Sequence, residues 1–266
     1  MYPSTPWLLA RPTSQGPAIR LFCLPNAGGA ASGYAPWRTR MPAFVDVLPI
    51  QLPGRENRHA EPAIANADEL VGQLVDVLAA YDDLPFAVFG HSMGAGLAFH
   101  AVQGLEKRGL PGPVRLFASS FRAPHLPSRH PRFSSLHGAA FLEALNRLGG
   151  LSPELVADPE YMDLLMPALR ADMTLVDQLE EPGTPVGCPI TALGGTEDER
   201  VARYELEGWE LHTRASHRTR MFPGGHFYLR EQPDGVVNAI AEELTLDLEL
   251  GRRADRAGVS PADRTP

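Results

Sequence analysis

The chain has 266 residues, is 44% hydrophobic and 21% charged, and carries a formal net charge of −8. The length and composition fit one large globular domain, and the negative charge argues against nucleic acid as a general partner. The sequence contains no apolar run of the roughly 20 residues that would span a membrane. The N-terminus lacks the features of a signal peptide, and Cys23 and Cys188 are too few for a disulfide framework, so we expect a cytoplasmic protein with reduced thiols.

The first part of the chain alternates predicted strands and helices. Apolar runs at 19–24 and 44–50 indicate strands, and the second run leads into the loop 51–56, Gln-Leu-Pro-Gly-Arg-Glu. Asn66 is a candidate helix N-cap, because Glu69 follows three residues later. Apolar residues at helical spacing predict the buried face of this helix: Leu70, Leu74, Val77 and Leu78.

A Gly-x-Ser-x-Gly motif, Gly90-His91-Ser92-Met93-Gly94, follows the apolar run 86–89 and precedes a helix predicted from about 93 to 107. This context is typical of a nucleophile elbow, a sharp turn that holds a serine at a strained backbone angle with its hydroxyl projecting. Side chains at the two glycine positions would collide with the adjoining strand or helix. Ser92 is therefore the candidate nucleophile.

The alternation is interrupted after a strand predicted at 114–118. The region that follows contains no convincing strand but two helical patterns, at about 138–148 and 159–179, and Pro167 should kink the second. Such an insertion, over about 121–188, is typical of a lid above an active site. Three methionines suit a deformable apolar pocket wall, although core packing is the simpler explanation for any one of them: Met162, Met166 and Met173.

Strands predicted at 190–193 and 218–222, with a helix rich in Arg and Glu between them, restore the alternation, and a final helix is expected from about 234 to 246. This order implies an α/β fold with a mostly parallel central sheet flanked by helices. We expect a single domain over residues 1–250 and a disordered polar tail over 251–266.

A serine nucleophile needs a base within hydrogen-bond reach and a third group that orients the base. In α/β-hydrolases the acid and then the histidine follow the serine along the chain. His226 lies in a Gly-Gly-His turn before the last helix and is the best base, with Phe227 able to shield its ring from water. His91 adjoins the serine but should point away from its hydroxyl. Three carboxylates after the strand at 190–193 compete as the acid: Glu197, Asp198 and Glu199.

An oxyanion hole should use the backbone N–H of Met93, the residue after the nucleophile, together with an N–H from the loop after the first strand. That loop, residues 24–30, contains Gly28 and Gly29, which let the chain turn an amide toward the site. Ala27 is the preferred second donor. No metal site is predicted.

Four motifs together resemble the external, or type II, thioesterases of polyketide synthase and nonribosomal peptide synthetase pathways, members of the α/β-hydrolase superfamily. The motifs are Leu24-Pro25-Asn26-Ala27-Gly28-Gly29, Gln51-Leu52-Pro53-Gly54-Arg55-Glu56, Gly90-His91-Ser92-Met93-Gly94 and Pro223-Gly224-Gly225-His226-Phe227-Tyr228-Leu229. The resemblance implies an α/β-hydrolase fold with a helical lid. It also implies Ser92 as nucleophile, Asp198 as acid, His226 as base, and Ala27 and Met93 as oxyanion donors.

The resemblance has two departures. Asn26 occupies a position where histidine is expected, and Glu199 one where proline usually follows the acid. Neither departure removes a catalytic group, but the carboxylate of Glu199 beside Asp198 is expected to raise the pKa of Asp198.

The function that the resemblance implies is hydrolysis of aberrant or stalled acyl groups from the phosphopantetheine arm of separate acyl- or peptidyl-carrier proteins. The enzyme would need no cofactor of its own and would also accept small acyl thioesters. Residues 107–147 carry seven Lys or Arg and one Glu, so a docking face with Arg122, Arg129 and Arg132 is one hypothesis for an acidic carrier. The alternatives are a carboxylesterase for small esters and a non-catalytic hydrolase-fold receptor.

Overall fold

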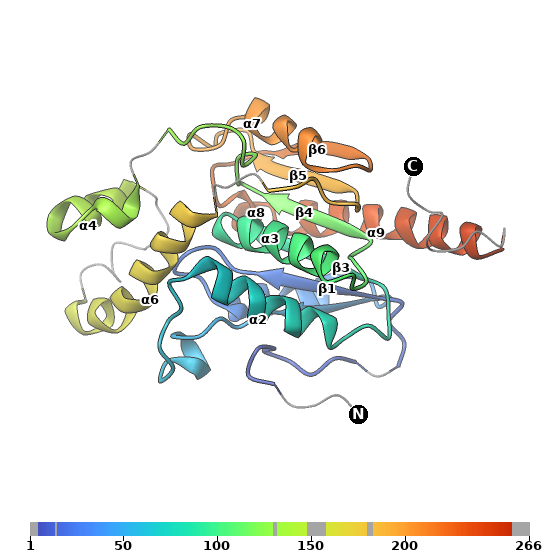
Figure 1. Ribbon diagram of the computed structural model, residues 1–266, viewed down its shortest axis with the longest axis horizontal. Coiled ribbons are helices and arrows are strands. Elements are labelled where there is room, and N and C mark those ends of the chain that lie inside the picture. Colours follow the sequence, from blue (N-terminus) through green and yellow to red (C-terminus); the bar gives the residue numbers. More distant parts are fainter. Residues whose placement is uncertain (1–4, 14, 130–131, 148–157, 180–182, 257–266) are drawn as a thin grey trace.

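The computed structural model describes residues 5–13, 15–129, 132–147, 158–179 and 183–256. At its centre is a sheet in the order β2-β1-β3-β4-β5-β6, in which every neighbouring pair is parallel (Figure 1). The strands are β1 (Ile19–Leu24), β2 (Val45–Pro49), β3 (Phe86–His91), β4 (Arg115–Ser119), β5 (Ile190–Gly195) and β6 (His217–Phe222). The predicted α/β fold with a largely parallel sheet is therefore confirmed.

Helices cover both faces of the sheet because the side chains of its central strands point alternately to opposite faces. In β1, Phe22 and Leu24 join the core under α2 (Ala67–Ala79) and α3 (Met93–Lys107), the longer helices of that face. Leu21 and Cys23 join the core on the other face. That second core is closed by the helices α1 (Trp37–Arg40), α8 (Tyr228–Glu231) and α9 (Pro233–Arg256).

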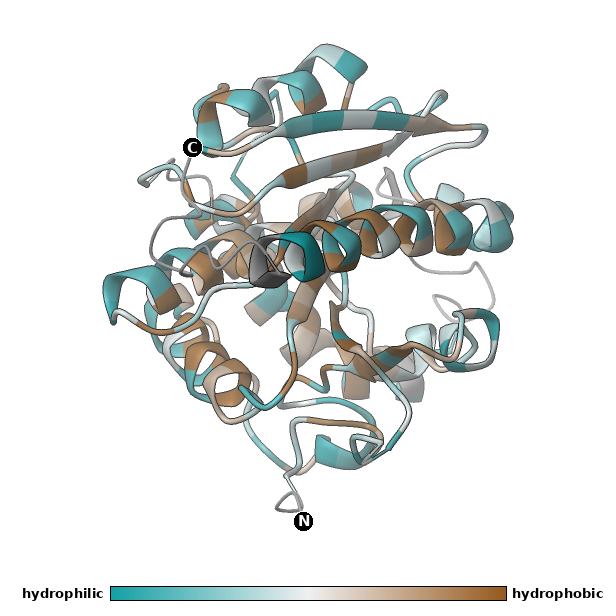
Figure 2. Ribbon diagram, turned by 90° about the vertical axis from the view of Figure 1, so that its right-hand side faces the viewer, coloured by the Kyte–Doolittle hydropathy of each residue, from teal (hydrophilic) through white to brown (hydrophobic). Residues whose placement is uncertain are grey.

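Local sequence signals account for how these helices begin and pack. The side chain of Asn66 accepts a hydrogen bond from the backbone N–H of Glu69 at 2.9 Å, which confirms the predicted N-cap of α2. Figure 2 shows hydrophobic residues concentrated on the central strands and on one side of the long helices, with hydrophilic residues toward the outside. The short helix α7 (Arg203–Glu207) follows β5, as the sequence predicts.

Between β4 and β5 the described residues form η3 (Phe133–Ser135), α4 (Gly138–Arg147) and α6 (Pro159–Gln178). We call these three elements the helical cover. They lie beyond one end of the sheet, and α6 continues through Pro167 (Figure 1). The cover has a small apolar core of its own, separate from the two cores of the sheet: Phe133, Phe141, Leu145, Leu169 and Met173.

The expected start of the tail is wrong. Helix α9 ends at Arg256, so residues 251–256 are helical rather than disordered, and residues 257–266 lie outside the described residues. The polar composition misled the prediction because arginine is a good helix former and no proline interrupts this stretch. Cys23 and Cys188 are buried, unlinked thiols. In the part of the chain that the structure describes, no helix is both long and apolar enough to cross a membrane.

Candidate active site

Ser92 sits at the turn between β3 and α3 with φ 53° and ψ −121°, a strained conformation for a residue with a side chain. A Cβ on Gly90 would come within 2.0 Å of the carbonyl oxygen of Gly94, and a Cβ on Gly94 within 2.3 Å of that of Leu24. Both contacts are far too short, so glycine is required at both positions. The predicted nucleophile elbow is therefore present in the structure.

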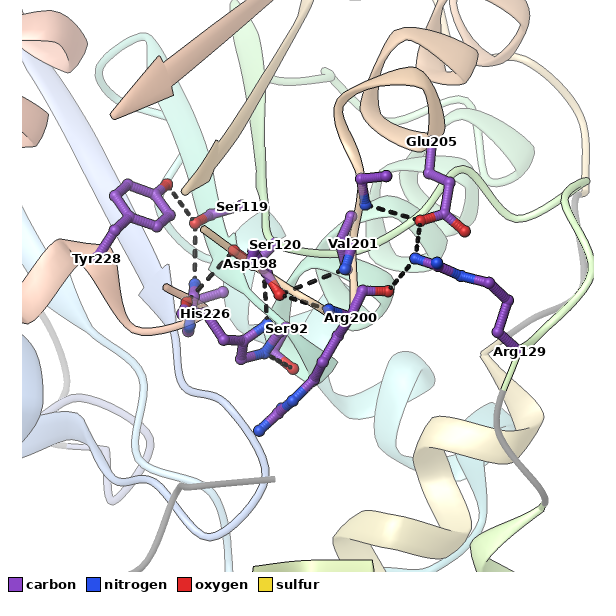
Figure 3. Close-up of polar contacts among 12 residues, drawn as sticks. Ser92, Ser119, Ser120, Arg129, Asp198, Arg200, Val201, Glu205, His226 and Tyr228 are labelled. Atoms are coloured by element: carbon purple, nitrogen blue, oxygen red, sulfur yellow. Dashed lines mark hydrogen bonds and ion pairs between the residues drawn. The ribbon is translucent and has the colours of Figure 1, made fainter. Parts of the chain in front are cut away.

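The structure brings Ser92, His226 and Asp198 together at the carboxyl ends of β3, β6 and β5 (Figure 3). His226 Nε2 lies 3.1 Å from Ser92 Oγ, and His226 Nδ1 lies 2.8 Å from Asp198 Oδ2. One ring nitrogen of the imidazole therefore meets the hydroxyl and the other meets a carboxylate. This chain of contacts can draw a proton from serine and stabilise the resulting imidazolium.

Asp198 is the one of the three candidate carboxylates that is buried, whereas Glu197 and Glu199 are exposed. Burial acts to raise the pKa of Asp198, but the hydrogen bond to His226 and that from the backbone N–H of Arg200 outweigh it and hold the pKa below its usual 3.8. The expectation that Glu199 raises this pKa is wrong, because that side chain points into solvent, where its charge is screened.

His91 is buried beside the site and, as expected, does not reach the serine hydroxyl. Its Nδ1 lies 2.9 Å from Ser119 Oγ, which in turn lies 2.7 Å from the hydroxyl of Tyr228. Burial, reinforced by the nearby His226 and arginines, lowers the pKa of His91 well below its usual value, so the ring is neutral. No sequence pattern pointed to Ser119, because a lone serine at a strand end is common.

The two expected oxyanion donors come from different elements. Ala27 lines the same pocket as Ser92, on the loop after β1, and Met93 is the first residue of α3, where a helix leaves its N–H groups without intrahelical partners. Asn26 donates its side-chain N–H to the Ala27 carbonyl at 2.8 Å. Gly28 adopts φ +70°, and this left-handed conformation turns the loop.

A buried ion pair, which the sequence did not reveal, holds this loop. Arg55 donates two hydrogen bonds to the carboxylate of Asp172 on α6, at 2.7 and 2.8 Å, and a third to the carbonyl of Gly29 at 3.0 Å. Asp172, whose side chain is 1% exposed, also accepts the backbone N–H of Gly28 at 2.8 Å. The Arg55 of the Pro-Gly-Arg-Glu loop therefore links the helical cover to the loop that carries Ala27.

The pocket that contains Ser92 and His226 is closed on one side by the helical cover. Of the predicted wall residues, Phe227 and Met173 line it, and Met166 packs against the core of the cover. Met162 is partly buried on α6 and, contrary to the prediction, is not among the residues that line this pocket. The remaining apolar lining was not predicted: Phe121, Phe133, Leu145, Leu169, Val176 and Val201.

The basic stretch is not a simple exposed patch. Arg122 is buried, its side chain donates to the carbonyl of Leu126, and it lines the pocket. Arg129 pairs with Glu205 at 2.6 Å. The hypothesis of a docking face made of Arg122, Arg129 and Arg132 is therefore wrong for Arg122, since the tertiary fold turns this residue inward.

Comparison with known proteins identifies the family of the chain. A sequence model described as the thioesterase domain matches residues 19–244. Gramicidin S biosynthesis protein GrsT of Aneurinibacillus migulanus is 34% identical over 243 residues, covering 91% of this chain and 95% of GrsT. The type II thioesterase BorB from the borrelidin biosynthetic cluster aligns with a TM-score of 0.79 at 36% identity, covering 92% of this chain and 100% of BorB.

A second solved structure gives the same result. YbtT, a type II thioesterase from the yersiniabactin NRPS/PKS biosynthetic pathway, aligns with a TM-score of 0.79 at 28% identity and covers 90% of this chain and 98% of its own. The predicted resemblance is confirmed by both sequence and fold. The chain therefore belongs to the thioesterase family, and its relatives include type II thioesterases of nonribosomal peptide and polyketide biosynthesis.

Proposed function

We propose that this thioesterase removes aberrant or stalled acyl groups from the phosphopantetheine arm of carrier proteins in a polyketide or nonribosomal peptide pathway. The observation that carries the proposal is the hydrogen-bonded series Ser92, His226 and Asp198, which opens into a pocket with apolar walls. Relatives from NRPS and PKS pathways support the substrate class. The partner would be an acyl- or peptidyl-carrier protein.

The first half-reaction forms an acyl-enzyme. Ser92 Oγ attacks the thioester carbonyl carbon while His226 Nε2, 3.1 Å away, takes the hydroxyl proton. The backbone N–H groups of Ala27 and Met93 stabilise the negative oxygen, each contributing about 3 kcal/mol. The carbon–sulfur bond then breaks, and the histidine returns the proton to the departing thiolate. Asp198 keeps Nδ1 of His226 protonated throughout.

The second half-reaction releases the acid. Water gives a proton to His226 Nε2 as it attacks the ester carbonyl of the acyl-enzyme, and the same two backbone N–H groups hold the second oxyanion. Collapse of this intermediate breaks the bond to Ser92 Oγ, which recovers its proton from the histidine. The free acid leaves, and every group returns to its starting state.

The test is a hydrolysis panel on carrier proteins that bear different acyl groups, with acyl-coenzyme A and a nitrophenyl ester for comparison. We expect the carrier-bound thioesters to give the highest kcat/KM. Ser92→Ala should lower kcat about a million-fold while the thermal melting curve shows a folded protein. A fluorophosphonate probe should label the wild type and fail to label this variant.

The panel also separates the proposal from its alternatives. A nitrophenyl ester hydrolysed faster than every thioester would favour a carboxylesterase for small esters. A protein that binds acyl groups but is not labelled by the probe would favour a non-catalytic receptor. Turnover retained by Ser92→Ala would remove the serine from the mechanism.

A further inference from the structure

Arg200 lies two residues after the acid Asp198, and its backbone is fixed on both sides. Its N–H donates to Asp198 Oδ1 at 3.0 Å, and its carbonyl accepts from the Arg129 side chain at 2.9 Å (Figure 3). Two hydrogen bonds therefore hold the backbone of the loop after β5 at the residue that carries this side chain. It lines the pocket that contains Ser92 and His226.

The guanidinium of Arg200 has no hydrogen bond or ion pair with any of the described residues. Its contact with an aromatic ring is that with Phe227, 5.9 Å from the guanidinium carbon to the ring centroid. The two other arginines of the pocket differ, because Arg129 is paired with Glu205 and Arg122 donates to a main-chain carbonyl. Of these three described arginines, Arg200 is thus the one whose side-chain N–H groups can bind a ligand without losing a protein partner.

A charge in this position carries an energetic cost. Burial lowers the pKa of Arg200 to about 10, partly offset by the charge of Asp198, so the side chain is still a cation at neutral pH. A partly desolvated cation is stabilised when an anionic oxygen completes its hydrogen bonds. Guanidinium groups favour carboxylates and phosphates, which can accept two parallel N–H bonds.

We propose that Arg200 binds an anionic oxygen group of the substrate, either a carboxylate on the acyl group or the phosphate of the pantetheine arm. The proposal rests on the proposed function, because it takes the acyl thioester as substrate. The ring of Phe227 is near both the guanidinium and His226, with its centroid 5.9 Å from the guanidinium carbon and 5.2 Å from the centroid of the imidazole. This closeness to the reacting atoms favours the acyl carboxylate, since the whole pantetheine chain separates the phosphate from the thioester.

The experiment uses two matched pairs of small thioesters. The first pair is malonyl and propionyl N-acetylcysteamine, which differ in the carboxylate. The second pair is propionyl phosphopantetheine and propionyl pantetheine, which differ in the phosphate. For Arg200→Gln we expect kcat/KM to fall roughly tenfold to hundredfold on the anionic member of one pair and to stay within about twofold on its neutral member. Arg200→Lys should recover part of this loss.

The matched control is Arg203→Gln, which removes an exposed arginine of α7 that pairs with Glu207. It should leave all four rates unchanged. The pair that responds to Arg200→Gln identifies the source of the anion. Equal losses on all four substrates, or no loss on any, overturn the proposal, and fluorophosphonate labelling of Ser92 in Arg200→Gln shows that the site is still assembled.

The same assay keeps this inference apart from the proposed function. A wild-type enzyme that hydrolyses the neutral thioesters, with no selective effect of Arg200→Gln, overturns the anion site and leaves the thioesterase mechanism standing. A wild-type enzyme that hydrolyses none of the four, nor any acyl carrier protein, overturns both.

Discussion

The catalytic residues and the helical cover are built in different ways. The Ser92, Asp198 and His226 side chains follow the carboxyl ends of the parallel strands β3, β5 and β6, of which β3 and β5 are paired on both sides and β6 on one. The cover instead packs around its own small apolar core, and α6 also contributes Leu175 to the core of the sheet. The chemistry is therefore placed on the rigid part, and the shape of the acyl pocket depends on the separately packed part.

A buried ion pair joins the two regions. The Asp172 carboxylate of α6 holds both Arg55 and the backbone N–H of Gly28, next to the proposed oxyanion donor Ala27. Most interactions of the cover should therefore affect which acyl groups are accepted. The Arg55–Asp172 pair should also affect the chemical step.

After Ser92→Ala, the largest effect is expected from Asp198→Asn, also within the catalytic region. The amide cannot hold His226 in the tautomer that accepts the serine proton, so kcat should fall about 10,000-fold while KM changes little. Steady-state kinetics on one acyl carrier protein measures both constants. A fall of less than about tenfold would mean that another carboxylate takes this role, and Glu199→Gln serves as the control that should stay near wild type.

Removing the Arg55–Asp172 ion pair should have the next largest effect. In Asp172→Ala the buried Arg55 loses its partner, so the free energy of unfolding should drop by about 3–5 kcal/mol. The loop with Ala27 also loses its support at Gly28, so kcat should fall about 100-fold. Denaturant unfolding and single-turnover hydrolysis measure the two effects.

A double variant separates stability from positioning. Arg55→Met with Asp172→Leu replaces the ion pair by apolar groups and should regain stability, while kcat stays low because Gly28 and Gly29 have still lost their hydrogen bonds. If kcat recovered with stability, the pair would matter for folding alone. Asp76→Asn breaks an exposed pair with Arg108 and should change neither quantity measurably.

Changes inside the cover should alter acyl preference more than catalysis. Met173 is 2% exposed and lines the pocket, so Met173→Ala should enlarge it and shift kcat/KM toward longer acyl chains by about tenfold. The unfolding free energy should fall by about 2 kcal/mol. Leu164→Ala, on the same helix but at a position that is 62% exposed, is the matched control. Parallel changes on acetyl and longer substrates would contradict a pocket role for Met173.

The smallest effect concerns acid stability. Because hydrogen bonds hold the pKa of Asp198 below 3.8 in the folded state, its ionised form stabilises the protein above the pKa of the unfolded chain. This contribution is lost as the pH falls from about 5 through the folded pKa. Asp198→Asn should therefore lose stability less steeply than the wild type in this range. The free energy of unfolding is measured in urea at several pH values between 5 and 3. If it falls equally steeply with pH in the wild type and in Asp198→Asn, the pKa of Asp198 is not depressed.

Local sequence patterns were enough to predict the strands, the elbow, the serine and the histidine. Apolar runs of strand length, the Asn66 cap and the Gly90–Gly94 motif depend on neighbours a few residues away, and the structure has each of them where it was predicted. Residues 251–256 are the exception. Their polar composition indicates that they bury little surface. It does not indicate whether the preceding helix continues through them, and extending a helix is easier than starting one.

The sequence by itself determined a parallel α/β sheet, a strained serine, and a histidine and a carboxylate after later strands, because parallel strands bring their carboxyl ends to one edge. The tertiary structure decided which of three neighbouring carboxylates is buried against His226, because exposure depends on the packing around the loop. It also decided that Arg55 meets Asp172, and that the guanidinium of Arg200 forms no ion pair within the described part of the chain. Residues more than a hundred positions apart form the first of these contacts, and no local pattern encodes such a meeting.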